Sequence, residues 1–187
     1  MKTSVIAIAG ASGSGKSTFT EALQKHLEQQ GFKTVVFAAD RYFNNPLPTM
    51  ISPADGETYP DWNHPASFDS AKLAEDIRTA RKSGQYDCIL TEGVTIFCTP
   101  EVRNLADCRV FIDASIEMRI FRRISRNVVT KGQTIEFIGD YYLKCARYRE
   151  KEFSLPSAVY ADVRVTNEYT FSIEAEWTKI KEILANK

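Results

Sequence analysis

A nine-residue glycine-rich stretch near the N-terminus constrains this chain more than any other feature. It reads Gly10-Ala11-Ser12-Gly13-Ser14-Gly15-Lys16-Ser17-Thr18 and fits the pattern G-x-x-x-x-G-K-[ST]. The apolar run at 5–9 predicts a buried strand before it, and the apolar spacing at 19–30 predicts a helix after it, ending at Gly31. A strand, a glycine loop and a helix N-terminus in this order aim backbone N–H groups at an anion. The stretch therefore predicts a loop that binds the phosphates of a nucleoside triphosphate.

Two side chains of this loop have expected roles. Lys16 is expected to reach the β- and γ-phosphates, and the Ser17 hydroxyl is expected to bind Mg²⁺. The alternative is an accidental match in a glycine-serine turn. At average composition about one chain in a hundred of this length carries the pattern by chance. The flanking strand and helix make an accident rarer still.

Composition limits the classes of partner. With 187 residues and 43% hydrophobic residues, the chain is expected to form one domain over 1–187. Its 24 basic and 24 acidic residues cancel, so no overall charge favours nucleic acid or a membrane surface. Four cysteines without a C-x-x-C pair predict reduced, mostly buried thiols. With no signal peptide and no apolar run of about 18 residues, we expect a cytoplasmic protein.

The apolar pattern predicts strands that alternate with helices. Further strands are predicted at 34–39, 86–91, 109–112 and 163–165, and further helices at 67–83, 116–129, 135–153 and 171–184. Five prolines and Gly56 predict irregular chain over 44–66, and a stretch of that length is usually functional or mobile. The alternation predicts a three-layer α/β/α fold of the P-loop NTPase type, with a five-stranded parallel sheet.

Three carboxylates follow predicted strands, at the edge where such sheets bind ligands. Asp40 is expected either to hold Mg²⁺ through water or to accept a proton from an attacking hydroxyl, and the alternative is a turn-capping role. Glu92 is expected near Mg²⁺, with an exposed strand end as its alternative. Asp113 is expected to act as the N-cap of the next helix.

A basic helix supplies candidate phosphate contacts. Arginines at 119, 122, 123 and 126 are spaced by three and four, so that three of them share one face. Such a run is commonly a solvated face, whereas in a triphosphate-binding protein it is a lid that brings guanidinium groups onto the transferred phosphoryl group. We predict a lid over about 119–135, with a hinge at 130–133.

With these residues in place, the chain resembles the uridine kinase branch of the P-loop nucleoside kinases, with features of nicotinamide riboside kinases and phosphoribulokinases. The resemblance covers nearly the whole length. Its landmarks besides the glycine loop are Asp40-Arg41-Tyr42-Phe43, Asn63-His64-Pro65-Ala66-Ser67-Phe68-Asp69, Thr91-Glu92-Gly93 with 101–105, 122–127, and 155–156 with 160–163. It implies a kinase with ATP as co-substrate, Mg²⁺ as cofactor and a small-molecule acceptor, which is bound by a loop at about 40–69.

The resemblance also implies a role for single residues. Asp40 is the base for the nucleoside 5′-hydroxyl, and Glu92 helps to order the Mg²⁺ shell. The remaining assignments are Arg123 on the ribose, Arg126 and Lys131 on phosphate, Tyr42 along the sugar pocket, and His64 beside the acceptor. Trp62 either stacks on a flat base or packs against the sheet.

The chain departs from the family pattern in three places. The ribose-binding aspartate is replaced by Asn63, so either Asn63 or Asp61 is expected to bind the ribose. The β-hairpin that holds the pyrimidine in uridine kinases is missing, because 83–85 lead directly into a strand. A usual lid arginine is replaced by Gln133. We therefore expect a uridine kinase-like enzyme, with a nicotinamide riboside, sugar or vitamin kinase, or a non-catalytic ATP-binding protein, as alternatives.

Overall fold

The central strand β1 (Ser4–Ala9) organises the fold of the computed structural model, which describes residues 3–186. Five parallel strands pair in the order β2-β5-β1-β6-β7, which confirms the predicted five-stranded parallel sheet. The other four strands are β2 (Thr34–Ala38), β5 (Cys88–Gly93), β6 (Cys108–Asp113) and β7 (Val163–Thr166). Val5 to Ala9 are fully buried, as expected of a strand covered on both faces.

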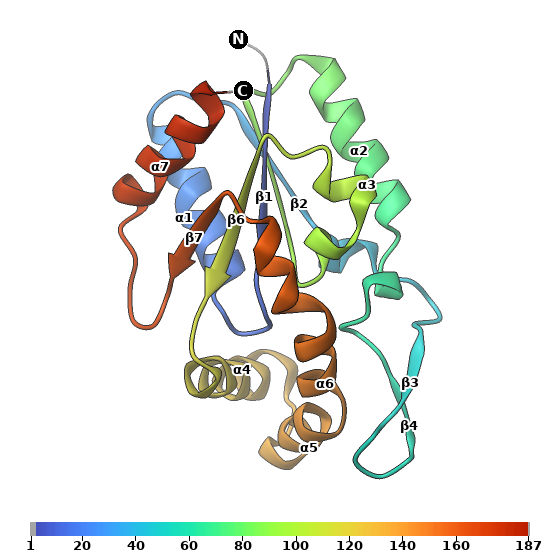
Figure 1. Ribbon diagram of the computed structural model, residues 1–187. Helices are drawn as coiled ribbons and strands as arrows, with labels where there is room; N and C mark the ends of the chain where they lie inside the picture. Colours follow the sequence, from blue (N-terminus) through green and yellow to red (C-terminus); the bar gives the residue numbers. More distant parts are fainter. Residues whose placement is uncertain (1–2, 187) are drawn as a thin grey trace.

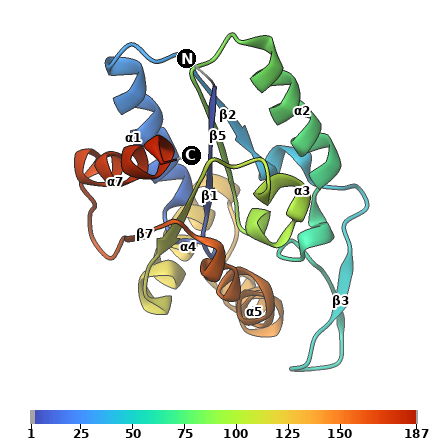
Figure 2. The ribbon, with the colours of Figure 1, turned by 45° about the horizontal axis from the view of Figure 1, so that its top comes forward.

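Helices cover both faces of this sheet (Figures 1 and 2). One core holds Ile6 and Ile8 against α1 (Lys16–Gln29) and α7 (Ile173–Ala185). The other holds Val5 and Ala7 against α2 (Ser70–Ser83) and α3 (Pro100–Arg103). Because successive side chains of a strand point to opposite faces, β1 serves both cores. The predicted three-layer α/β/α arrangement is confirmed.

Beyond the carboxyl ends of the strands, helical chain closes one end of the molecule (Figure 1). It consists of α4 (Ile116–Lys131), α5 (Ile135–Tyr141), a π-helical turn Tyr142–Ala146, α6 (Arg147–Arg149) and a second π-helical turn Glu150–Ser154. An antiparallel hairpin, β3 (Thr49–Ile51) with β4 (Thr58–Pro60), lies at the same end. Both chain termini lie at the opposite end.

Several local predictions need correction. The stretch 44–66 is not wholly irregular, because it contains the β3–β4 hairpin. The helix predicted from 67 begins at Ser70, because the Asp69 side chain accepts a hydrogen bond from the Lys72 backbone N–H and caps it. Asp113 does not cap α4: it ends β6, and Ser115 caps the helix by accepting from the Met118 N–H.

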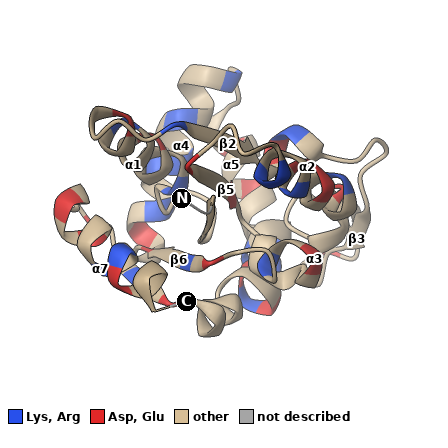
Figure 3. Cartoon of the chain, turned by 90° about the horizontal axis from the view of Figure 1, so that it is seen from above, with Lys and Arg blue, Asp and Glu red and all other residues tan. Residues whose placement is uncertain are grey.

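Charge is mixed over the surface. Figure 3 shows basic and acidic residues interspersed on α2 and α7, in keeping with a net charge of zero. Within residues 3–186, no helix is both long and apolar enough to cross a membrane. The four cysteines are free thiols, three of them buried, as predicted.

The core on the α2 face provides a test of the fold. Ile77 of α2 is fully buried in it, so Ile77→Ala is expected to lower the free energy of unfolding by about 2–5 kcal/mol. Ile51→Ala is the matched control, because that side chain is 71% exposed and should change stability by about 0.5 kcal/mol or less. Urea unfolding of both variants measures the difference. Equal losses would contradict the assigned core.

Candidate functional site

The glycine loop connects β1 to α1 and approaches other backbone closely. Gly13 and Gly15 adopt φ of 82° and 95°, a left-handed conformation that other residues rarely take. A Cβ at Gly13 would collide with the Arg119 carbonyl oxygen, and one at Gly15 with the Asn167 amide. The first turn of α1 carries no acidic side chain, so its N-terminus is free to receive an anion.

Lys16 lies at the centre of the site. Its side chain is buried, with Nζ 3.4 Å from the Ala11 carbonyl oxygen. Burial lowers the pKa of Lys16, while the carboxylates of Glu92 and Asp40 act in the opposite direction. All three predicted residues line one cavity. Lys16 begins α1 after the glycine loop, Asp40 lies in the turn after β2, and Glu92 lies near the end of β5.

Ser17 and Glu92 form a candidate metal site. The Ser17 hydroxyl donates a hydrogen bond of 2.8 Å to Glu92 Oε1 at the edge of the cavity. Mg²⁺ prefers oxygen ligands, takes few of them from protein and keeps several waters, so this hydroxyl and carboxylate fit it. No group of three or more His, Cys, Asp or Glu suited to a metal occurs in the described part of the chain. The Ser17 hydroxyl and the Glu92 carboxylate are therefore the two protein oxygens of this candidate site.

A cavity of about 450 Å³ runs from the glycine loop to the end of α5. Its phosphate-loop end carries Ser12, Lys16 and Ser17, with Asp40 and Glu92 beside them. Its basic wall comes from α4, and its far end is mainly aromatic and apolar. The basic residues are Arg123, Arg126 and Lys131, and the far-end residues include Phe43, Trp62, Phe68, Phe137, Ile138 and Tyr141.

The four arginines of α4 divide into two pairs. Arg123 and Arg126 line the cavity, and Arg123 leaves Nε and Nη1 without a hydrogen-bond partner in the described chain. Burial lowers the pKa of Arg123, which an incoming anion would counteract. Arg119 and Arg122 instead bind the protein itself, so they are not available to a ligand.

Arg119 forms a buried ion pair with Glu150 beneath the glycine loop. Its Nη1 lies 2.9 Å from Glu150 Oε2, both side chains are buried, and Arg119 Nε donates to the Ala114 carbonyl oxygen. Gly13 packs on the backbone of Arg119, so an ion pair that fixes Arg119 also helps to fix the position of the glycine loop. The sequence offered no local signal for it, since the partners are 31 positions apart.

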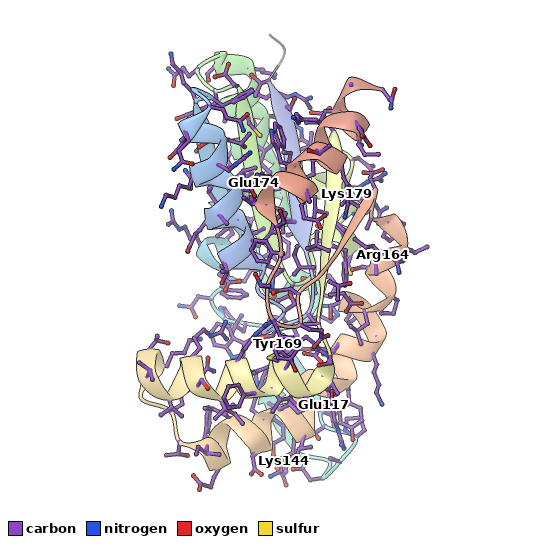
Figure 4. The ribbon with its side chains drawn as sticks, turned by 90° about the vertical axis from the view of Figure 1, so that its left-hand side faces the viewer. Glu117, Lys144, Arg164, Tyr169, Glu174 and Lys179 are labelled. Atoms are coloured by element: carbon purple, nitrogen blue, oxygen red, sulfur yellow. The ribbon has the colours of Figure 1, made fainter. Side chains whose placement is uncertain are left out.

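The loop after β7 ties the glycine loop to α4, and it was not predicted. Asn167 Nδ2 donates a 2.9 Å hydrogen bond to the Ser14 carbonyl oxygen, while Arg122 donates to the carbonyl oxygens of Asn167 and Glu168. The Glu168 carboxylate accepts from Ser115, the N-cap of α4. Figure 4 shows this loop, marked by Tyr169, next to the helix that carries Glu117. The sequence signal that could have predicted this contact is Asn167, a polar residue that directly follows β7 at the edge where parallel sheets bind ligands.

The predicted acceptor residues are only partly brought together. Trp62 and the buried Asn63 line the cavity. Asp61 does not, because its carboxylate is buried in an ion pair with Arg149 Nε at 2.7 Å. The structure thus places Asn63, and not Asp61, where a ligand can reach it.

Two further predicted residues also lie outside the cavity wall. The Tyr42 hydroxyl donates to Asp76 on α2, which positions the turn that contains Asp40. His64 accepts a hydrogen bond from the Ala66 N–H and packs edge-on against Phe153. Both residues therefore contact other parts of the protein and not the cavity. Thr18 is exposed at the loop and is likewise not part of the lining.

The buried pair beneath the loop can be tested through stability. Arg119→Met is expected to lower the free energy of unfolding by about 3–5 kcal/mol, because it leaves the Glu150 carboxylate buried without its partner. The double variant Arg119→Met with Glu150→Leu should recover most of that loss. Glu117→Gln, on the exposed face of the same helix, is the control for denaturant unfolding. A single variant within about 1 kcal/mol of the parent would contradict a buried pair.

Known proteins share this fold and pattern. Sequence relatives include a uridine kinase of Macrococcus caseolyticus, 27% identical over an alignment of 207 residues that covers 98% of both chains. A uridine kinase of Anoxybacillus flavithermus is 28% identical and covers 96% of this chain and 94% of its own. A solved structure of a possible uridine kinase from Bacillus stearothermophilus has a TM-score of 0.52 at 21% identity, covering 88% of this chain and 89% of that one.

A family model matches almost the whole chain. The model described as the phosphoribulokinase / uridine kinase family matches residues 5–86 and 63–173, which include the glycine loop, both candidate carboxylates and α4. The match agrees with the convergence of Lys16, Ser17 and Glu92 at one cavity. The chain belongs to the phosphoribulokinase / uridine kinase family of phosphotransferases.

Proposed function

We propose that this protein transfers the γ-phosphoryl group of Mg·ATP to the 5′-hydroxyl of a ribonucleoside, with uridine or cytidine as first candidates. The observation that carries the proposal is a single cavity in which Lys16, the Ser17–Glu92 pair and Asp40 meet at one end and aromatic side chains meet at the other. A pure nucleotide-binding protein needs neither carboxylate nor an aromatic second compartment.

The nucleotide half holds phosphate and charge. Backbone N–H groups of the loop and the α1 N-terminus receive the phosphates, and the buried Lys16 ammonium adds a fixed positive charge. Ser17 and Glu92 would hold Mg²⁺, which when bound offsets charge on the β- and γ-phosphates. Arg126 and Lys131, on the opposite wall, are placed to stabilise charge that spreads over the transferred group.

Asp40 is the candidate base. Within residues 3–186 its exposed carboxylate makes no hydrogen bond or ion pair, so it is free to accept a proton from an acceptor hydroxyl. It lines the cavity between the glycine loop and the aromatic end. In this transfer the protein does little covalent chemistry, so placing the hydroxyl against the phosphorus atom matters most.

The aromatic end suits a flat base joined to a polar sugar. Trp62 and Phe43 pack edge to face with centroids 5.1 Å apart, and Asn63 offers an amide beside them. Only 84–87 separate α2 from β5, so no hairpin covers a pyrimidine from that side. Nicotinamide riboside is the second candidate acceptor, because the nicotinamide riboside kinases that the sequence resembles are also short at this place.

A panel of acceptors in a coupled ADP-release assay tests the proposal. Uridine, cytidine and nicotinamide riboside are compared with ribose and fructose. Because stacking of a base on aromatic side chains contributes about 1–3 kcal/mol, kcat/KM for the preferred nucleoside should exceed that for ribose about tenfold or more. A sugar preferred over all nucleosides, or background ADP release with every acceptor despite ATP binding, would contradict the proposal.

Removal of the candidate base is the second test. Asp40→Asn should lower kcat by about 10²–10⁴-fold while ATP binding stays nearly unchanged, because the amide cannot accept the proton. Asp113→Asn is a matched control, since Asp113 is likewise an exposed aspartate at this edge of the sheet, as the last residue of β6, but does not line the cavity. Calorimetric titration with ATP and steady-state rates give the two readouts. A near-normal kcat in Asp40→Asn would exclude Asp40 as the base.

A further inference from the structure

We propose that Tyr141 is the positioning residue of the acceptor pocket: its hydroxyl holds residues 60–62 in place, and its ring supports Arg123. The inference rests on the proposed function and assigns a role to a single residue of α5. Tyr141 ends α5 and lines the cavity between its aromatic far end and its basic wall. Its side chain thus contacts both the segment 60–62 and Arg123.

The hydroxyl makes two hydrogen bonds to one short segment. It donates to the Pro60 carbonyl oxygen at 3.0 Å and accepts from the Trp62 backbone N–H at 3.3 Å. Pro60 ends β4, and both Pro60 and Trp62 line the cavity. One hydroxyl therefore uses its donor and an acceptor position to fix the backbone that carries Trp62 and leads to Asn63.

The hydroxyl stays protonated under ordinary conditions. Burial raises the pKa of Tyr141 to about 12, so the O–H remains a donor to Pro60 at any pH at which the protein would be assayed. The bridge is therefore a fixed structural contact and not a pH switch.

The ring faces the basic wall. The Arg123 guanidinium carbon lies 5.5 Å from the Tyr141 ring centroid, within the range of a cation–π contact. Arg123 is largely buried and has two nitrogens without hydrogen-bond partners in the described chain. Because few contacts fix this guanidinium, the ring is a main determinant of where it points.

Neighbouring turns of the same helical segment also hold the hairpin. Lys144, one turn beyond Tyr141, lies 3.6 Å from Asp55 in the β3–β4 turn, and Arg149 pairs with Asp61. Figure 4 places Lys144 at the end of the molecule where the hairpin lies. These contacts dock the hairpin as a whole, whereas Tyr141 acts at its cavity end. Displacement of Tyr141 should therefore change acceptor binding more than overall stability.

The test separates the hydroxyl from the ring. Tyr141→Phe removes only the hydroxyl, so KM for the acceptor should rise about five- to tenfold, while kcat and KM for ATP stay within about twofold. Tyr141→Leu also removes the ring, so kcat should fall about tenfold as well, because Arg123 loses its support. Tyr148→Phe is the matched control: it lies on the same segment, its hydroxyl accepts only from Arg147, and it does not line the cavity.

A second readout needs no activity. Hydrogen exchange of the Trp62 amide should be about fivefold faster in Tyr141→Phe and unchanged in Tyr148→Phe, because only the first variant removes the acceptor of that N–H. An unchanged acceptor KM, or equal losses in the KM values for acceptor and ATP, would overturn the inference. If the parent protein were inactive toward every acceptor, the proposed function would be wrong. In that case the hydrogen-exchange measurement still tests the positioning role, and an unchanged exchange rate of the Trp62 amide in Tyr141→Phe would overturn it.

Discussion

The register of the parallel sheet is the constraint on which the site depends. Ile8 of β1 and Ala38 of β2 both lie level with Glu92 of β5. Gly10 and Asp40 each follow two residues later, so the glycine loop and both carboxylates reach the same edge at the same height. If β1 shifted by one residue against its neighbours, its side chains would point to the opposite faces of the sheet. Ile6 and Ile8 would then lie in the core that now holds Val5 and Ala7. Packing on both faces of β1 therefore also fixes the geometry of the site.

Residues near strand ends could be predicted because their positions follow from local pattern and this topology. Lys16 was predicted from the glycine pattern between a strand and a helix. Asp40 and Glu92 were predicted from the apolar strands that lead to them and the rule that parallel sheets bind ligands at their carboxyl edge. The position of Asp61 could not be predicted, because its carboxylate pairs with Arg149, which is 88 positions away in the sequence. The hairpin at 49–60 was not predicted, because its two strands have only three residues each and the stretch 44–66 contains five prolines, which disfavour strands.

The basic helix shows why a charge pattern does not specify function. Helical spacing alone cannot tell Arg119 from Arg123, although they are one turn apart. What separates them is the environment: Arg119 meets the buried Glu150 carboxylate, while Arg123 meets an aromatic ring and open cavity. Burial of an unpaired guanidinium is costly, so an anion that paired with Arg123 would offset that cost. Of the four arginines that suggested a lid, only Arg123 and Arg126 line the cavity, so only these two remain candidates for that role.

The two halves of the cavity are built by different means, and this bears on how acceptor choice can change. The phosphate half is part of the sheet and the loops that leave it, so altering it disturbs the central core. The half that we propose binds the acceptor includes a hairpin and the residues after it, which are held against a helix by contacts between residues 79 to 88 positions apart, outside the sheet. Loops of this kind tolerate changes in length at small cost in free energy. If the proposed function holds, changes to the hairpin and the facing turn of helix in this chain would thus alter the acceptor pocket without disturbing the phosphate half.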